Sequence, residues 1–346
     1  MSALPALPHA GFPASAPAPQ LTQPPGGHAA PALVDIERLA GKPTVTASAS
    51  PFNLDDDRSY RRWRAAKLDA CTAPGAAAVV ELGDPGALSA VERQALLQAL
   101  SRHNLVVYRG PASEAGPALQ LALARQLGLQ HGDTNWLAGE DGISRITRSD
   151  APEGRGGFIP YTDRALRWHT DGYYHPAGRR IRSMLLHCVR PAAEGGESAL
   201  LDHEIAYILL RDAAIGHVRA LMANDAMTIP ARLDEDGVAR AAQAGPVFSV
   251  DPVDGRLHMR YTARSRSIEW KDDTPTRQAA ACLQALLQSE LPQLLRLRLE
   301  AGMGVVTHNV LHDRSAFVDD AARPRLLYRA RYRDLSVAPD LPWRNG

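Results

Sequence analysis

The amino-acid sequence predicts a mainly β fold of the sandwich or jelly-roll class, with helices flanking the strands. After residue 164 the chain alternates short apolar runs with turns, only two helical patterns interrupt them, and no internal repeat is visible. Of the 346 residues 45% are hydrophobic, which is enough apolar material for a large core. We therefore expect a single folded domain over residues 51–346.

The first fifty residues predict a disordered tail rich in Pro and Ala. Nine of the residues 1–50 are proline, which fixes φ and removes backbone donors, so neither helix nor sheet is favoured. No basic stretch precedes an unbroken apolar run, and the first arginine is Arg38, so neither a secretory signal nor a transit peptide fits well. The folded domain is expected to begin near Pro51.

The first half of the domain predicts two helices around one buried strand. Ser89 and Glu92 have the spacing of a capping box at the start of an amphipathic helix. The apolar run 105–108 predicts a strand, and a second helix is expected over 117–127. From 128 to 161 the pattern breaks down into Gly, Asp and Ser, which predicts a long loop that could act as a lid over a site.

The second half of the domain predicts most of the strands. One helix is expected after Asp202 as N-cap, and another after Thr274 as N-cap, running to Leu287. Apolar runs that predict strands occupy residues 165–168, 183–189, 198–201, 247–250, 257–261, 305–307 and 326–332.

Composition excludes several classes of function. The chain carries 39 basic and 38 acidic residues, a formal charge of +1, and only 5% aromatic residues, which argues against a dedicated nucleic-acid binder. No run of 18 uncharged apolar residues predicts a membrane span. Three widely separated cysteines offer neither a disulfide framework nor a thiolate zinc site. We expect a cytoplasmic protein that binds neither nucleic acid nor a membrane.

Two His-x-Asp motifs are candidates for metal ligation. His169 and Asp171 follow the predicted strand 165–168, where residues i and i+2 face the same side, so both can point into the mouth of a barrel. His131 and Asp133 lie in the Gly-rich segment, where nothing holds their geometry, and His131 is interpreted as a solvated loop residue.

A third ligand is expected from a distant strand end, where His308 and His312 are available. Their i,i+4 spacing could form a helical zinc pair, but Asn309 stands where a zinc protease needs a catalytic Glu. Two imidazoles and one carboxylate form the facial triad of non-haem Fe(II) oxygenases, which leaves coordination positions open.

Four ordered blocks make the sequence resemble a known family. They are Trp168-His-Thr-Asp171, Gly195-Gly-Glu-Ser198, His312-Asp-Arg-Ser-Ala-Phe317, and Arg325 thirteen residues after His312. Their order and spacing resemble the TauD/TfdA superfamily of Fe(II)/2-oxoglutarate-dependent dioxygenases over residues 95 to 335. The His-x-Arg-x-Ala-Phe block is most similar to the γ-butyrobetaine hydroxylase branch.

The resemblance implies a double-stranded β-helix, a member of the jelly-roll class, and a dioxygenase that consumes 2-oxoglutarate and O2. It implies hydroxylation of a small molecule with release of succinate and CO2, and a possible homo-oligomer. The carboxylate at Asp171 argues against halogenation, because related halogenases carry a small residue there. The implied residues are His169, Asp171 and His312 for Fe(II), Ser198 and Arg325 for the far carboxylate of 2-oxoglutarate, and Arg329 near substrate and co-substrate.

The substrate is predicted less directly, from residues near these blocks. Tyr173 and Tyr174 follow the His-x-Asp motif and could begin a cation–π cage for a quaternary ammonium group. In contrast, Arg260, Arg264 and Arg266 would share one face of a strand, and Arg331 stands where the γ-butyrobetaine branch is expected to carry an aromatic cage residue.

These arginines favour an anionic or zwitterionic substrate, such as a carboxylate, sulfonate or phosphonate. The alternatives are a γ-butyrobetaine-like hydroxylase, a cupin-like iron or zinc hydrolase, and a non-catalytic jelly-roll binding module. Arg325 and Ser198 disfavour the hydrolase, which has no use for a distal carboxylate clamp, and the intact ligand set disfavours the binding module.

Overall fold

A computed structural model describes residues 50–71, 79–112, 116–134, 138–149, 158–234 and 237–336. All of them belong to the unit Thr44–Gly346, one of the two compact units of the chain. The expected tail over 1–50 lies outside the described residues except for Ser50. None of the helices in these ranges is long and apolar enough to cross a membrane.

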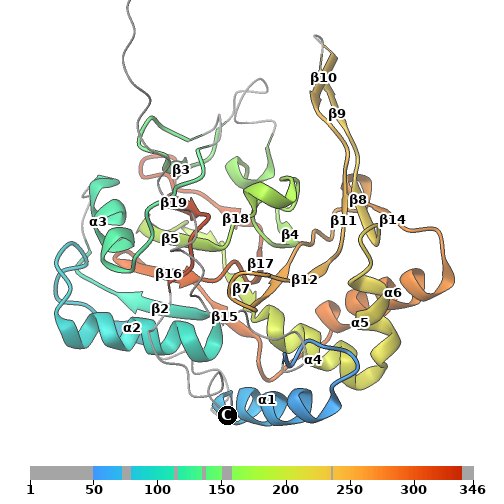
Figure 1. The fold of residues 1–346 in the computed structure, drawn as a ribbon. Helices are drawn as coiled ribbons and strands as arrows, with labels where there is room; N and C mark the ends of the chain where they lie inside the picture. Colours follow the sequence, from blue (N-terminus) through green and yellow to red (C-terminus); the bar gives the residue numbers. More distant parts are fainter. Residues whose placement is uncertain are drawn as a thin grey trace, which may run out of the picture. The chain divides into compact units, whose positions relative to one another are not determined.

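The larger of two main sheets has six strands (Figure 1). Only β1 and β2 pair in parallel, and every other neighbouring pair in this sheet is antiparallel. In spatial order the strands are β1 (Val79–Glu81), β2 (Leu105–Arg109), β16 (Met303–Thr307), β5 (Ser183–Arg190), β19 (Leu326–Tyr332) and β3 (Ser144–Ile146).

The smaller main sheet is antiparallel, with the order β15 (Leu295–Leu297), β7 (Ser198–Leu201), β17 (Leu311–Arg314) and β4 (Leu166–His169). A two-stranded ladder joins β18 (Phe317–Val318) to β6 (Glu194–Gly195). The remaining ladders contain β8 (Met227–Ile229), β9 (Arg232–Asp234), β10 (Gly237–Arg240), β11 (Gln243–Gly245), β12 (Phe248–Val250), β13 (Leu257–Met259) and β14 (Glu269–Trp270).

The two main sheets enclose an apolar interior, and helices cover their outer faces. Leu200 of β7 packs in one cluster with Val107 of β2 and Leu327 of β19, so these residues face inward from the two sheets. The next residue on β7, Leu201, packs outward with the helices, as the two-residue repeat of a strand requires. Polar residues on the inward face of these strands therefore enter the space between the sheets.

The helices are divided between the two sheets (Figure 1). Those that pack on the six-stranded sheet are α2 (Ala90–His103) and α3 (Ala118–Gln126), and those on the outer side of the four-stranded sheet are α1 (Asp57–Ala70), α4 (His203–Ala213), α5 (Ile215–Leu221) and α6 (Thr274–Gln288). Short 3-10 turns span Ile159–Tyr161, Ala177–Arg179 and Ser265–Ser267.

The helix starts that were predicted from residues close together in the sequence are largely confirmed. Ser89 and Glu92 form the expected capping box, and Asp202 caps α4. The N-cap of α6 is Asp273, one residue before the expected Thr274, because the Asp273 carboxylate accepts the hydrogen bond from the Thr276 amide.

Two predictions about strands and loops were wrong. The segment 128–161 is not without structure, since β3 lies within it and pairs with β19 as the edge of the larger sheet. The strand expected over 257–261 ends at Met259, and the chain then turns into Ser265–Ser267. Arg260, Arg264 and Arg266 therefore do not share one face of a strand.

Candidate metal centre and co-substrate pocket

Three side chains form the centre of the candidate site. His169 ends β4 and lies directly opposite His312 of β17 in the antiparallel register, with ring centroids 4.2 Å apart. Asp171 follows two residues after His169, and one ligand atom from each of the three lies within 4.8 Å of the others. All three side chains are largely buried. Strand register thus brings together residues that are far apart in the sequence.

The two imidazoles are held in the tautomer that a metal requires. The Nδ1 of His169 lies 2.9 Å from the Arg167 carbonyl, and the Nδ1 of His312 lies 3.0 Å from the Val310 carbonyl. Because a carbonyl only accepts, each Nδ1 carries the proton and each Nε2 keeps its lone pair. Burial, together with the nearby His312, lowers the pKa of His169 to about 3, so this ring is neutral at physiological pH.

The backbone of Asp171 is fixed by Asn309, in the turn between β16 and β17. Asn309 accepts a hydrogen bond from the Asp171 amide at 2.7 Å and donates to its carbonyl at 3.0 Å. Asn309 has a φ of 52°, a left-handed conformation that asparagine tolerates better than most residues. Gly172 is also left-handed, and a Cβ there would lie 2.4 Å from Ile181. The two turns aim the Asp171 carboxylate between the sheets.

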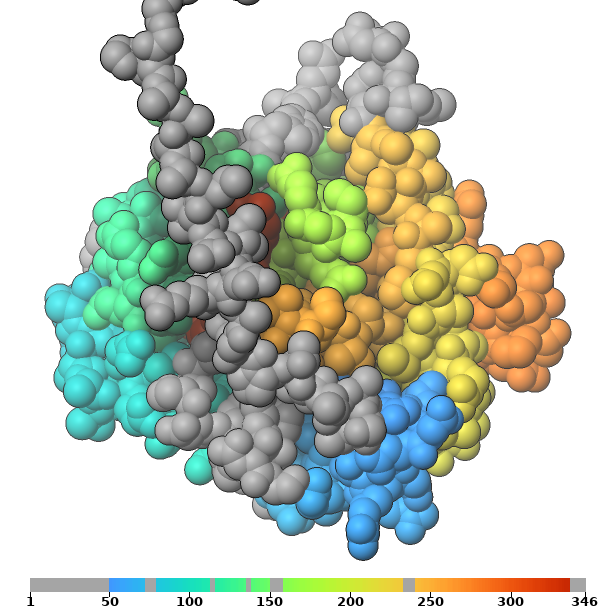
Figure 2. Space-filling model, in the orientation of Figure 1, coloured from blue at the N-terminus to red at the C-terminus, as the bar shows by residue number. Residues whose placement is uncertain are grey.

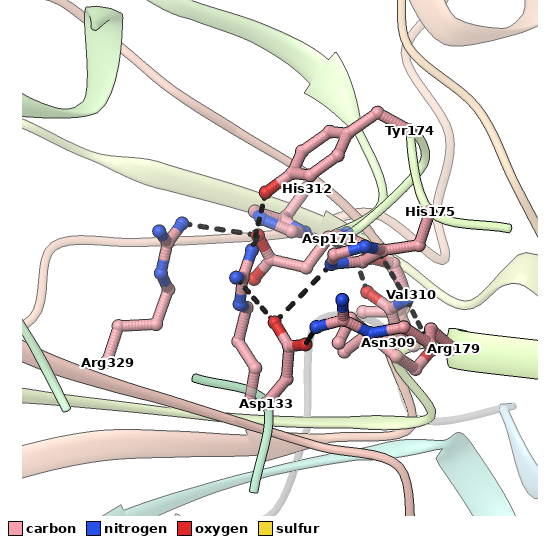
Figure 3. A network of polar contacts seen from close by, with 11 residues as sticks. Asp133, Asp171, Tyr174, His175, Arg179, Asn309, Val310, His312 and Arg329 are labelled. Carbon is pink, nitrogen blue, oxygen red and sulfur yellow. Dashed lines mark hydrogen bonds and ion pairs between the residues drawn. The ribbon is translucent and has the colours of Figure 1, made fainter. Parts of the chain in front are cut away.

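Two arginines of β19 reach the Asp171 carboxylate (Figure 3). Arg329 Nη1 lies 3.2 Å from Asp171 Oδ1, and Arg331 Nη1 lies 3.8 Å from the same oxygen. Burial alone would raise the pKa of Asp171, but the two guanidinium groups hold it well below its usual range. The other oxygen, Oδ2, is buried with no hydrogen-bond partner in the described part of the chain.

The donor set therefore fits a metal ion. Two neutral imidazole nitrogens, one ionised carboxylate and an unpaired carboxylate oxygen converge on one point, and this is the facial arrangement that Fe(II) oxygenases use. The hydrogen bonds from each Nδ1 to a carbonyl are the outer-shell contacts that orient such ligands.

A second carboxylate, Asp133, pairs with Arg331, and Figure 3 shows it beside His175 and Arg179. Its oxygens lie 2.7 Å from Arg331 Nη2, 3.1 Å from Arg179 Nη2 and 3.4 Å from His175 Nε2. The Asp133 side chain is 1% exposed. Burial alone would raise the pKa of Asp133, but the nearby His175 and the charge of Arg331 lower it overall.

A separate pocket, with about 230 Å³ of empty space, lies beside the metal centre and is lined by Ser198 and Arg325, among others. Ser198 is on the same face of β7 as Leu200, whose cross-strand partner is His312, so the pocket is one two-residue step from the triad. Gly196, with a φ of 70°, lies against the Arg325 side chain, and at Gly195 a Cβ would meet the Ala316 carbonyl at 2.4 Å. Because neither glycine carries a Cβ, the chain at Ala316 and Phe317 can pack directly against the backbone of Gly195 and Gly196.

Arg325 is a buried cation that has no counterion among the residues the structure describes. Its residue is 5% exposed, and its guanidinium makes no hydrogen bond or ion pair with any described residue; its amide alone is bound, to Asp319. Burial lowers the pKa of Arg325 to about 10. The ring of Phe317 lies 5.0 Å from the Arg325 Cζ and 4.8 Å from the Arg314 Cζ. A carboxylate entering the pocket would supply the missing charge.

Both predicted tyrosines lie near the metal centre, but with different surroundings. The Tyr174 hydroxyl accepts a hydrogen bond from Arg331 Nη1 at 3.1 Å, and the Arg240 Cζ lies 5.9 Å from its ring centroid. Both side chains pack against the apolar cluster beneath α4 to α6, and burial raises the pKa of the Tyr173 hydroxyl. The rings meet edge to face at 5.3 Å.

Of the three arginines predicted after β13, Arg260 lines a pocket that also contains Asp171, whereas Arg264 and Arg266 are not part of that lining. Arg260 donates to four backbone carbonyls, those of Met227, Gln243, Gly245 and Pro246, so its guanidinium fastens two chain segments together. Arg264 is half-buried and close enough to Tyr173 to influence its hydroxyl, and Arg266 is exposed.

The other histidines considered from the sequence lie outside the centre. The His131 side chain is 66% exposed and pairs with Asp334, as expected for a loop residue. His308 is buried within hydrogen-bond distance of Asn104 and the Ser336 carbonyl. The chain from His308 to His312 forms a turn and a strand, so these residues do not make a helical zinc pair.

Sequence reasoning missed Asp133, Asn309 and Arg314. Arg314 donates to the carbonyls of Pro160, Thr162 and Arg164, and so ties the chain before β4 to β17. Arg314 lies within the His312–Phe317 block and Asn309 just before it. Their position next to a predicted ligand was the signal that could have pointed to a role in fixing the backbone there. In the sequence, Asp133 stands out only as part of the second His-x-Asp motif, with His131.

Comparison with known proteins identifies the family. Residues 66–331 match the model of the "Taurine catabolism dioxygenase TauD, TfdA family". A uridine-5'-phosphate dioxygenase from Streptomyces sp is 32% identical over 221 residues, covering 58% of this chain and 72% of the relative. A second protein of that name, from Amycolatopsis sp, is 30% identical over 195 residues, covering 54% and 67%.

Among solved structures, the non-haem iron oxygenase OrfP in complex with Fe, succinate and (3R,4R)-dihydroxy-L-Arg has a similar fold. Its TM-score is 0.53 at 20% identity, covering 80% of this chain and 92% of OrfP. The chain therefore belongs to the TauD/TfdA family and is a 2-oxoglutarate-dependent dioxygenase, with Fe(II) as its metal and 2-oxoglutarate and O2 as its co-substrates.

Proposed function

We propose that this dioxygenase oxidises a small phosphorylated substrate of the nucleoside 5'-monophosphate type. In this proposal His169, Asp171 and His312 hold Fe(II), while Ser198 and Arg325 hold the far carboxylate of 2-oxoglutarate. The two main sheets form a double-stranded β-helix within one domain over 51–346, preceded by a tail over 1–50. In the same proposal the segment 128–161, in which Asp133 contacts Arg331, acts as a lid over the site.

The positive charge around the metal centre supports an anionic substrate. Arg329 and Arg331 are inward-facing residues of β19, and the Nε atom of each is buried without a hydrogen-bond partner among the described residues. The same holds for Nη1 of Arg240, whose guanidinium lies over the Tyr174 ring. Buried guanidinium donors without partners are costly, and a phosphate group satisfies several at once. This observation carries the proposal.

The names of two relatives support a phosphate as the anionic group. Two proteins at 32% and 30% identity are named uridine-5'-phosphate dioxygenases, and both matches include a substantial part of the domain. Taken with the arginines, the names favour a phosphate ester over the carboxylates and sulfonates that the sequence also allows.

In this proposal different residues bind the metal, the co-substrate and the substrate. When bound, the iron supplies oxidation of the substrate coupled to conversion of 2-oxoglutarate into succinate and CO2. His169 and His312 keep their protons on Nδ1, so both Nε2 lone pairs stay available. Arg325 and Ser198 orient the co-substrate from the adjacent pocket, and Arg329 and Arg331 place the substrate anion beside Asp171.

The γ-butyrobetaine-like alternative has weaker support. A cage for a trimethylammonium group needs aromatic faces free of other cations. The guanidinium of Arg240 already lies over the ring of Tyr174, and Arg331 binds its hydroxyl. A second cation placed against this ring would be repelled.

The test is succinate release by the iron-loaded enzyme with each of three substrates: uridine 5'-phosphate, uridine and γ-butyrobetaine. We expect turnover with the phosphate alone. If the oxidised carbon carries the phosphate ester, the new hydroxyl group expels inorganic phosphate and leaves an aldehyde, so phosphate release reports the position of attack. Equal turnover of uridine and uridine 5'-phosphate would refute recognition of the phosphate, and turnover of γ-butyrobetaine alone would establish the alternative.

A further inference from the structure

The pocket that contains Ser198 and Arg325, the proposed co-substrate pocket, is also lined by a second arginine, Arg298. Arg298 follows β15, and Leu297 of β15 is the cross-strand partner of Ser198, so the antiparallel register places Arg298 beside Ser198. Its side chain is 38% exposed. Arg325, which immediately precedes β19, is 5% exposed, and Figure 2 shows little of this red part of the chain on the face drawn. The two arginines therefore differ in their access to solvent.

Arg298 also differs from Arg325 in its contacts, because its donors already bind the protein itself. Its Nη2 lies 2.5 Å from the Ala192 carbonyl oxygen and 3.3 Å from the Ala193 carbonyl oxygen, and it donates to both. Its Nε lies 3.5 Å from Glu300 Oε1. Arg298 therefore connects the chain after β15 to the chain before β6.

The segment that Arg298 binds lies outside both neighbouring ladders. Residues 191–193 connect β5 to β6, after the last residue of β5 that pairs with β19 and before the first residue of β6 that pairs with β18. Backbone carbonyls outside a ladder need other hydrogen-bond donors. The guanidinium of Arg298 supplies donors at two consecutive carbonyls, and so holds this connection in place.

Ala192 forms the part of the pocket wall that lies next to the Arg325 side chain. A Cβ placed on Gly196 would lie 3.7 Å from Ala192 Cβ and 3.8 Å from Arg325 Nε, so both groups border the same point. Ala192 is buried, and its carbonyl is the one that Arg298 binds at 2.5 Å. Apolar side chains complete the lining: Pro191, Leu299 and Leu327. A shift of Ala192 would therefore enlarge the pocket beside Arg325.

We propose that Arg298 is a positioning residue that sets the chain length of the 2-oxo acid, by holding Ala192 at the end of the co-substrate pocket. This rests on the proposed binding of the far carboxylate by Ser198 and Arg325. 2-Oxoglutarate has two methylene groups between its oxo carbon and that carboxylate. 2-Oxoadipate has one more, so its carboxylate would press into the wall at Ala192 while its oxo group stayed at the metal.

The expected selectivity follows from this extra methylene group. One methylene group too many in a closed pocket changes affinity by about 10- to 200-fold, and the wild-type protein should prefer 2-oxoglutarate by a factor in this range. The charge of Arg298 cannot produce the preference, because both acids are dianions and are attracted alike. The ratio of their dissociation constants therefore reports the position of the wall and not the charge of Arg298.

The test is an anaerobic titration of the Fe(II)-loaded protein with each acid, followed by the visible absorption that a 2-oxo acid produces when it binds ferrous iron. Arg298→Met removes the hydrogen bonds to Ala192 and Ala193, and Arg298→Lys restores a charged donor. Ala192→Gly removes the wall Cβ and keeps the arginine. The matched control is Arg296→Met, at an arginine of β15 whose side chain is 46% exposed and lies 3.8 Å from Glu290.

Arg298→Met and Ala192→Gly should each reduce the preference for 2-oxoglutarate to within about threefold. Arg298→Lys should recover most of the preference, and Arg296→Met should keep the wild-type ratio. Equal binding of both acids by the wild-type protein would overturn the proposal. An unchanged ratio in Arg298→Met or in Ala192→Gly would overturn it too, even where the affinity for both acids falls, because a loss common to both acids reports charge alone.

A reference variant separates this proposal from the assignment on which it rests. Arg325→Ala should weaken the binding of both acids. If it does so while Arg298→Met keeps the wild-type ratio, Arg325 remains the carboxylate site and only the role of Arg298 is refuted. If Arg325→Ala leaves both affinities unchanged, the far carboxylate binds elsewhere and both assignments are refuted. The phosphorylated substrate does not enter either result, because the titrations contain none.

Discussion

The substitution Asp133→Asn tests whether the buried carboxylate behind Arg331 supports the metal centre. Asparagine has the same shape and keeps one acceptor oxygen, but it removes the charge that faces three basic side chains. The contact with Arg331 is 2.7 Å long, with side chains 1% and 3% exposed, so solvent cannot replace the lost partner. The Arg179 side chain is 53% exposed and should contribute little.

The expected loss of stability follows from the difference in burial between the Arg331 contact and the Arg179 contact. Removing one partner of a buried ion pair costs about 3–5 kcal/mol, and the retained amide oxygen argues for the lower end of that range. A loss of about 3 kcal/mol corresponds to a fall in Tm of about 6 °C for a domain of this size. The matched control is Asp141→Asn, which breaks an ion pair with Arg145 at 2.8 Å whose side chains are 25% and 38% exposed. That change should cost under about 1 kcal/mol.

The assay is thermal unfolding of both variants beside the wild type, repeated as the pH is lowered. The native pKa of Asp133 lies below its ordinary value of 3.8, so its stabilising effect is present above about pH 4 and is lost as the pH falls through the native pKa. The difference between wild type and Asp133→Asn should therefore shrink in acid. Iron affinity should fall too, because the released Arg331 competes for Asp171. If Asp133→Asn melts within about 1 °C of Asp141→Asn, well below the expected 6 °C, the reasoning fails.

Three further substitutions test the site directly. His169→Ala should abolish Fe(II) binding in an anaerobic titration, whereas His131→Ala, in the other His-x-Asp motif, should leave it intact; equal binding by both would remove His169 as a ligand. Arg325→Ala should raise the KM for 2-oxoglutarate by about 30-fold or more, from roughly 2–5 kcal/mol for a buried charge contact, and an unchanged KM would place the co-substrate elsewhere. Asn309→Ala should weaken iron binding with little change in the KM for 2-oxoglutarate, because it frees the backbone of Asp171 but does not touch the Arg325 pocket; a shift confined to that KM would contradict the assigned role.

Local signals in the sequence predicted local structure. The capping box at Ser89 depends on residues three apart, and β7 follows from an unbroken apolar run, so both could be found without tertiary information. His169 was preferred over His131 because it follows a predicted strand, and β4 is indeed that strand. At these positions the sequence pattern alone determines the local structure, so the predicted elements are confirmed.

Long-range contacts account for what could not be predicted. β3 is short and polar, and it forms a strand because it pairs with β19 at the edge of the larger sheet. Asp133 lies 198 residues from Arg331, and no spacing rule joins a Gly-rich segment to the last strand of a sheet. The turn after Met259 is likewise set from outside, since the Arg260 amide bonds to Val247 and Thr262 bridges to His169.

The pairing of His169 with His312 also constrains when the proposed ligand set can form. The two histidines face each other only in one register of β4 and β17, and a slip of one residue would turn one ring to the opposite face. His312 comes 143 residues after His169 in the sequence, so β17 can pair with β4 only when both segments have been synthesised. The three side chains therefore converge only after the smaller sheet has folded in this register.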